Sequence, residues 1–164
     1  MDTTNLNLIK NILFIFSYVV ITEKIGGFMG RKTGTGKVME LNIREALKFG
    51  CYDFSEQVPV GERLGGGKHR IDFLVDNSGF KIGISSKWQQ SSGTAEQKLP
   101  YEYMCLAKAI NEGYINKAYL VFGGPGWTKD SFFLDELSDW VSIESDITVI
   151  KLEEFIALAN QSSI

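Results

Sequence analysis

The chain has 164 residues, the size of one domain whose core needs no disulfide. A hydrophobic content of 44% and a charged content of 23% exclude a disordered or fibrous protein. The net charge of −3 excludes a whole-molecule attraction to nucleic acid or anionic membranes, so a polyanionic partner needs a local basic patch. The single histidine, His69, excludes a histidine-rich metal site. Cys51 and Cys105 lack metal-ligand spacing and predict reduced thiols in the cytoplasm.

The longest apolar run is ILFIFSYVVI, residues 12–21. It is too short to span a bilayer, and no small-residue cleavage site follows it, so we expect neither a membrane segment nor a secretory signal. Met29 opens a sequence typical of a protein start. We therefore interpret 1–28 as an N-terminal extension, upstream of the natural start or peripheral to the fold, and 29–164 as a single domain.

Hydrophobic spacing and turn residues predict the elements along the chain. A helix over 38–49 and a strand over 54–60 are followed by a Gly-rich loop at 61–68 and a β-hairpin over 69–88. The rest is predicted as a helix within 91–113, with a buried stripe of Leu99, Tyr103, Leu106 and Ile110, a strand at 117–122, a helix at 130–140, a strand at 147–152 and a helix at 153–160. The order α-β-β-β-α-β, then α-β-α, predicts an α/β (α+β) fold with a mixed central sheet flanked by helices.

The hairpin carries a charged face. With Asn77-Ser78 as its tip, the alternating apolar residues of both strands share one face, and Asp72, Ser85 and Lys87 share the other. This register places Asp72 opposite Gly83, whose missing side chain would leave space for a metal ion. The plainer interpretation is a solvated outer face with Asp72 and Lys87 as surface charges.

The ordered set of motifs resembles the PD-(D/E)xK nuclease superfamily: an acidic helix, then Asp72 on one strand, then x-x-Lys87 ending the next, then a helix. The following run, 87-KWQQSSGTAEQK-98, is similar to a segment of type II restriction endonuclease-like members. The resemblance covers roughly residues 38–127 and implies a restriction-endonuclease-like core of αβββαβ order. It also implies a cytoplasmic endonuclease that hydrolyses double-stranded DNA with Mg²⁺, for which Mn²⁺ substitutes.

One position departs from the family pattern. Ser85 stands where the family has Glu or Asp, and a hydroxyl is a poor ligand for a hard cation. Either the site has lost activity, or a second carboxylate comes from the following helix, as in members with Ser-x-Lys. Glu102, fifteen residues after Lys87, is the first candidate for this ligand beside Asp72, and Glu96 is the reserve. A surface glutamate remains the alternative for Glu102.

Further residues are candidates for the site or for contacts with DNA. Glu40 matches the acidic residue that the family places on its first helix, and Gln89 shares the parity of Lys87 and is a candidate to bind water or phosphate. His69 is expected to contact phosphate or solvent. Contacts with DNA are expected from a basic set: Arg31, Lys32, Lys37, Lys68, Arg70 and Lys98.

The resemblance implies a water activated by Mg²⁺ at Asp72 and Glu102, with Lys87 holding that water or the scissile phosphate. Cutting both strands implies two sites and hence a homodimer or a higher homo-oligomer. The competing hypothesis is a catalytically inactive nuclease-fold protein that binds DNA or serves as a scaffold. In that case Ser85 indicates that the site has lost activity.

Overall fold

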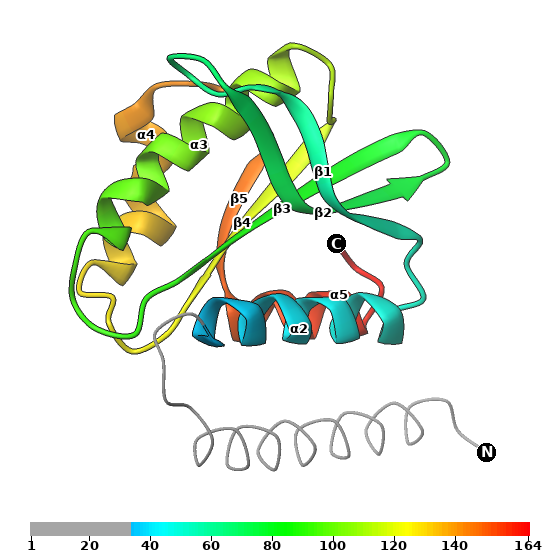
Figure 1. Ribbon diagram of the computed structural model, residues 1–164, viewed down its shortest axis with the longest axis horizontal. Helices are drawn as coiled ribbons and strands as arrows, with labels where there is room; N and C mark the ends of the chain where they lie inside the picture. Colours follow the sequence, from blue (N-terminus) through cyan, green and yellow to red (C-terminus); the bar gives the residue numbers. More distant parts are fainter. Residues whose placement is uncertain (1–33) are drawn as a thin grey trace. The chain divides into compact units, whose positions relative to one another are not determined.

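A five-stranded mixed sheet forms the centre of the computed structural model, which describes residues 34–164 (Figure 1). The strands are β1 (Phe54–Glu62), β2 (Lys68–Asn77), β3 (Phe80–Trp88), β4 (Lys117–Gly123) and β5 (Ile147–Lys151), and they lie in the order β1-β2-β3-β4-β5. β1, β2 and β3 are antiparallel, whereas β3, β4 and β5 are parallel. The expected extension 1–28, its apolar run, Arg31 and Lys32 lie outside the described residues.

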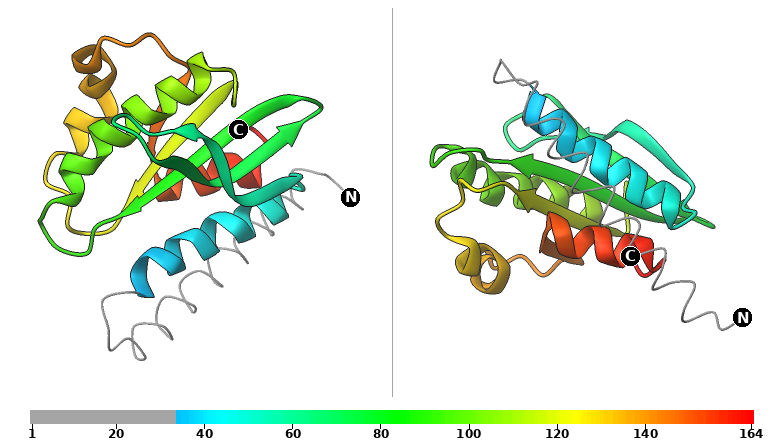
Figure 2. Two further views of the ribbon diagram at one scale, coloured as in Figure 1. Left: turned by 45° about the horizontal axis from the view of Figure 1, so that its top comes forward. Right: turned by 90° about the horizontal axis from the view of Figure 1, so that it is seen from below.

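Helices cover both faces of the sheet. They are α2 (Gly34–Phe49), α3 (Ala95–Asn111), the π-helical turn η1 (Phe132–Glu136), α4 (Leu137–Val141) and α5 (Leu152–Asn160). Figures 1 and 2 show α2 and α5 side by side on one face and α3 with α4 on the other. No helix within residues 34–164 is long and apolar enough to cross a membrane.

The core beneath α3 follows the predicted stripe. Leu99, Tyr103 and Leu106 are each at most 1% exposed, and they pack with Leu120 and Phe122 of the central strand β4. After Lys117, β4 is apolar and buried, as is usual for a parallel strand with helices on both faces. The predicted order of elements and the mixed sheet are therefore confirmed.

The predicted register of the β2–β3 hairpin is wrong by two residues. The turn lies at Ser78-Gly79, where both φ angles are positive (54° and 93°), so Asn77 pairs with Phe80. Such a turn matches the twist of the strands, and glycine accepts the second positive φ without strain. A two-residue slide changes the partner of each residue but keeps its predicted face where the strands are paired. Gly83 therefore pairs with Leu74, not with Asp72. Beyond the last pair the predicted faces fail, because Ile71 lies beside Gly83 and Asp72 binds Ser86.

The space predicted beside Gly83 is filled. A Cβ at Gly83 would lie 2.8 Å from Cδ1 of Ile115 and 3.2 Å from Cδ1 of Ile71. Gly83 thus permits tight apolar packing and leaves no space for a metal ion. The pairing between β2 and β3 ends at Phe73–Ile84, one residue short of Asp72. Figure 1 shows β1 and β2 turning away from β3 beyond this point.

Candidate active site

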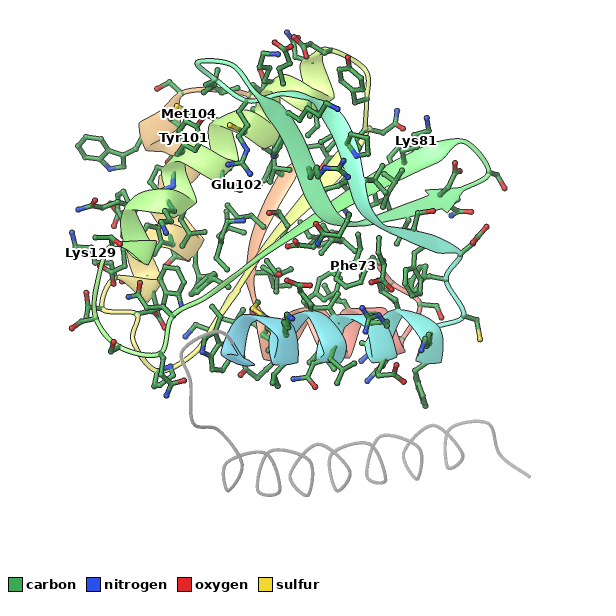
Figure 3. All side chains as sticks on the ribbon, viewed as in Figure 1. Phe73, Lys81, Tyr101, Glu102, Met104 and Lys129 are labelled. Carbon is green, nitrogen blue, oxygen red and sulfur yellow. The ribbon has the colours of Figure 1, made fainter. Side chains whose placement is uncertain are left out.

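Glu102 of α3 occupies the place where β2 and β3 separate. Its Oε1 accepts hydrogen bonds from Ser85 Oγ on β3, at 2.8 Å, and from His69 Nε2 on β2, at 3.1 Å. Its Oε2 lies 3.4 Å from the ammonium of Lys87. Figure 3 shows Glu102 on the side of α3 that faces the sheet, and the residue is 4% exposed. Glu102 is therefore buried near Lys87, and the alternative of a surface glutamate is wrong.

The surroundings of Glu102 keep it ionised. Burial alone would raise the pKa of this carboxyl group, because a charge is costly away from water. The hydrogen bond from His69, the charge of Lys87 and the hydrogen bond from Ser85 outweigh burial and lower the pKa to about 2. A buried carboxylate held in this way remains a negative charge throughout the neutral pH range.

Asp72 contacts the neighbouring residue of β3 and not Ser85. Its Oδ2 accepts hydrogen bonds from the backbone N–H of Ser86, at 2.6 Å, and from the Ser86 hydroxyl, at 2.8 Å. Successive side chains of a strand alternate between faces, so Ser86 points away from Ser85 and Lys87. The expectation that Asp72, Ser85 and Lys87 gather around one gap is therefore corrected. Asp72 and Glu102 bind adjacent residues of β3 from different elements.

Glu40 of α2 lies close enough to Asp72 for the charge of Asp72 to affect the pKa of Glu40. Partial burial raises the pKa of Glu40, and the negative charge of Asp72 raises it further, while Arg44 and Lys37 act in the opposite direction. The acidic residue predicted on the first helix is thus an electrostatic neighbour of Asp72. A cation bound at Asp72 would also lower the free energy of an ionised Glu40.

The strand β1 is strained where it passes Asp72. Gln57 lies between the pairs Glu56–Phe73 and Val58–Ile71, opposite Asp72, and adopts φ 52°, which is unusual for a residue other than glycine. Its amide donates to Asp72 Oδ1 at 3.2 Å. Backbone strain of this kind is found preferentially at functional sites, and here it turns a polar side chain toward the carboxylate.

Gln89 and Glu96, two further candidates from the sequence, hydrogen-bond to the loop after β4. The Gln89 amide donates to the carbonyl of Gly126 at 2.6 Å, and the residue is 4% exposed, so it fixes the segment after β4. Oε1 of Glu96 accepts hydrogen bonds from the N–H and hydroxyl of Thr128, at 2.6 and 2.9 Å. Hydrogen bonding by Thr128 lowers the pKa of Glu96. Glu96 is therefore engaged with the loop after β4, and Glu102 takes the place near Lys87.

The described members of the basic set are exposed but do not form one patch. Lys68 and Arg70 lie two residues apart on β2, and Arg70 donates to the carbonyl of Gln57 at 2.8 Å. Lys37 lies on α2 and Lys98 on α3, which cover opposite faces of the sheet.

The donor atoms suit a hard divalent cation. Within residues 34–164, no three His, Cys, Asp or Glu side chains gather as a ready metal cluster. Asp72 Oδ1 has only the 3.2 Å contact from Gln57, and Glu102 Oε2 only the 3.4 Å contact from Lys87, among the described hydrogen bonds and ion pairs. One oxygen of each carboxylate thus keeps lone pairs for a ligand. Mg²⁺ uses one or two carboxylates and retains waters, so each of these carboxylates suits it as a ligand, although they bind adjacent residues of β3 whose side chains point to opposite faces.

The sequence alone did not reveal three of these contacts. His69 is wholly buried, so the expectation of a contact with phosphate or solvent is wrong. Ser86 and Gln57 carry no chemical signature, and their contacts with Asp72 depend on the divergence of the strands. The two-residue interval between His69 and Ile71, both on the buried side of β2, is the one pattern that indicates a core histidine.

Comparisons with known proteins bear on the family. A model described as a PD-(D/E)XK nuclease superfamily domain matches residues 31–163. No curated protein matches the chain. Three solved structures are similar to parts of it. The protein of unknown function AF1548 has 11% identity, a TM-score of 0.45, and coverage of 69% of this chain and 57% of its own.

Protein VC1899 from Vibrio cholerae has 14% identity and a TM-score of 0.44 over 76% of this chain and 31% of its own. The small subunit of the heterodimeric restriction endonuclease R.BspD6I has 20% identity and a TM-score of 0.41 over 76% of this chain and 67% of its own. The chain thus spans just over half of AF1548 and about a third of VC1899. On the match over residues 31–163, the chain belongs to the PD-(D/E)XK nuclease superfamily.

Proposed function

We propose that the protein is a Mg²⁺-dependent endodeoxyribonuclease that hydrolyses phosphodiester bonds of double-stranded DNA, of the restriction or mobile-element type. One observation carries the proposal. Glu102 brings an ionised carboxylate to Ser85 Oγ and Lys87 Nζ, where the family motif would have its second acidic residue. Hydrogen bonds from His69 and Ser85 and the charge of Lys87 keep this carboxylate ionised although it is buried.

Each residue of the site has a role in this proposal. Asp72 and Glu102 would hold the cation through their less engaged oxygens, Oδ1 and Oε2. Mg²⁺ supplies a more acidic bound water and neutralises charge that develops on the phosphate. Lys87, whose side chain is 25% exposed, reaches solvent and contacts the scissile phosphate or the attacking water. Ser85 donates to Glu102 and is in turn hydrogen-bonded by Lys87 Nζ at 2.9 Å, which fixes both groups.

The partners follow from the substrate. A duplex has two antiparallel strands, so we expect two copies of the chain to cut it as a homodimer or higher homo-oligomer. Lys68 and Arg70, which are exposed on β2 near Asp72, are the first candidates for phosphate contacts. A cytoplasmic location is part of the proposal, and two cysteines without a disulfide suit a reducing compartment.

The test is cleavage of supercoiled plasmid and phage DNA with Mg²⁺, Mn²⁺ or EDTA. We compare the wild type with Asp72→Ala, Glu102→Gln and, as a matched control, Glu144→Gln at an exposed position. Metal-dependent fragments are expected from the wild type and from Glu144→Gln. Loss of these fragments in both other variants, with folding retained by circular dichroism, supports the relocated carboxylate.

Two outcomes would change the proposal. Cleavage that survives Glu102→Gln but not Asp72→Ala would move the second ligand to Glu40, the electrostatic neighbour of Asp72. No metal-dependent cleavage by folded wild type on any DNA would contradict the proposal. It would favour the non-catalytic DNA-binding alternative, with Glu102 serving only to fasten α3 to the diverging strands.

A further inference from the structure

A cavity lies beyond the carboxyl ends of the three parallel strands, away from Glu102. Its volume is about 330 Å³, and its lining includes the last residue of each of these strands: Trp88 of β3, Gly123 of β4 and Lys151 of β5. Small-ligand sites have volumes of roughly 300–1,000 Å³, and open α/β sheets bind ligands outside the carboxyl ends of their strands. Trp88 directly follows Lys87, so the cavity begins one residue from the candidate active site.

Two partly exposed indoles in the lining are held rigidly. Trp88 lies against a bare glycine backbone: a Cβ at Gly124 would come within 3.0 Å of its ring, and one at Gly123 within 3.4 Å. The indole N–H of Trp127 donates to the Gly123 carbonyl at 2.8 Å, and its ring meets that of Phe122 edge-on with centroids 5.1 Å apart. Rigid aromatic surfaces bind a flat ligand at little cost in side-chain entropy.

The charges of the lining select among flat ligands. Asp130 and Glu153 contribute two carboxylates, and Lys151 contributes one ammonium, which already pairs with Asp130 Oδ2 at 2.7 Å. This excess of negative charge repels a phosphate group. Carboxylates accept hydrogen bonds from amino groups such as those on the edges of cytosine and adenine.

We propose that this cavity takes one unstacked base of the DNA strand, a base with an exocyclic amino group, and stacks it on Trp88 and Trp127. The inference rests on the proposed function only in taking DNA as the ligand. A base seated there would fix the adjacent backbone relative to Lys87, so the cavity would contribute to substrate positioning. Base–aromatic stacking tolerates any base, and the carboxylates supply the preference against thymine.

The experiment uses intrinsic fluorescence. The chain has three tryptophans, and Trp140 on α4 is 73% exposed and outside the cavity, so the Trp140→Phe protein reports only on Trp88 and Trp127. This protein is titrated in EDTA with short single-stranded oligonucleotides of cytosine, adenine or thymine, and with an abasic strand carrying the same phosphates. The same titrations are run after adding Trp88→Leu or Trp88→Phe.

We expect saturable quenching by the cytosine and adenine strands, weaker quenching by thymine and none by the abasic strand. Trp88→Leu should weaken binding by about tenfold, and Trp88→Phe, which keeps a ring, by less. Equal quenching by the abasic strand, or equal affinity after Trp88→Leu, would overturn the inference, as would no quenching at all. Because no metal or cleavage is involved, failure here leaves the nuclease proposal standing, and loss of cleavage leaves this result standing.

Discussion

The hydroxyl of Ser85 donates a 2.8 Å hydrogen bond to the carboxylate of Glu102, seventeen residues away on the next helix. A glutamate at position 85 would itself extend toward the place that Glu102 fills. The short serine therefore leaves room for a carboxylate supplied by α3. Both arrangements put one negative charge beside Lys87, and they differ in which element carries it.

An exchange of the two residues tests this relation. Ser85→Glu alone would crowd two carboxylates into one buried space, and we expect cleavage to fall by about 100-fold or more. Ser85→Glu combined with Glu102→Ser restores one carboxylate and one hydroxyl, so most of the activity should return. Initial rates of supercoiled plasmid loss in Mg²⁺ measure both. A double variant no more active than Ser85→Glu would show that the two positions are not interchangeable.

Glu102 also predicts a pH dependence of stability. Its pKa in the folded protein is about 2, below the ordinary 4.5, so the unfolded chain binds the proton more readily. The ionised group therefore stabilises the fold above pH 4.5, by about 3 kcal/mol at most, and this contribution is lost as pH falls toward 2. Urea unfolding of the metal-free protein measures it. The stability difference between wild type and Glu102→Gln should shrink across this range.

Exposed Glu144 provides the control for that measurement. Glu144→Gln should change the free energy of unfolding little, because the side chain is exposed. A difference for Glu102→Gln that stays constant between pH 4.5 and 2 would mean that the buried carboxylate is not held ionised by its neighbours.

His69 is expected to position Glu102 and not to touch the substrate, since it is 0% exposed. A carboxylate only accepts, so the imidazole Nε2 is the donor to Oε1, and Oε2 is left for Lys87. His69→Leu should lower kcat by about 10- to 100-fold with little change in KM for DNA. His69→Gln keeps an N–H near the same place and should recover much of the loss. If both variants lost kcat equally, and the loss followed their loss of stability, His69 would have only a packing role.

The sequence predicted the fold well because its signals are local and repeated. The stripe of Leu99, Tyr103 and Leu106 identified α3 and its buried face, and the alternation along β2 and β3 identified both strands. The register failed because alternation constrains which face a residue occupies but not its partner, and a two-residue slide is invisible to it. The turn chemistry of Ser78-Gly79 was the missing information.

The site was predicted only in part, for a related reason. Glu102 was predicted from the resemblance, because members with Ser-x-Lys take their second carboxylate from the helix that follows the lysine. The contacts of Asp72 could not be predicted, since they depend on β2 leaving β3 after the Phe73–Ile84 pair. The position of His69 in the core likewise follows from that divergence and from α3 closing over it.

The pKa of Glu40 should depend on the charge of Asp72. Burial raises the pKa of Glu40 first, and the charge of Asp72 raises it next. Asp72→Asn removes that charge, so the pKa of Glu40 should fall toward its ordinary value. Carboxyl carbon chemical shifts followed by NMR against pH would show this. Adding Mg²⁺ to the wild type should shift Glu40 in the same direction if the cation binds at Asp72, whereas it should leave Asp72→Asn unchanged.

Substitution of Gly83 tests whether the space beside it is packed by side chains or open for a metal ion. A Cβ there would lie 2.8 Å from Cδ1 of Ile115, closer than side chains tolerate, so Gly83→Ala should destabilise the protein by about 1–3 kcal/mol. Gly36→Ala on α2 is the matched control, because nothing lies within 4 Å of its added Cβ and alanine favours a helix. Urea unfolding of both variants gives the comparison. If Gly83→Ala kept full stability but lost Mg²⁺-dependent cleavage, the space would belong to the metal, as the hairpin pattern alone predicted.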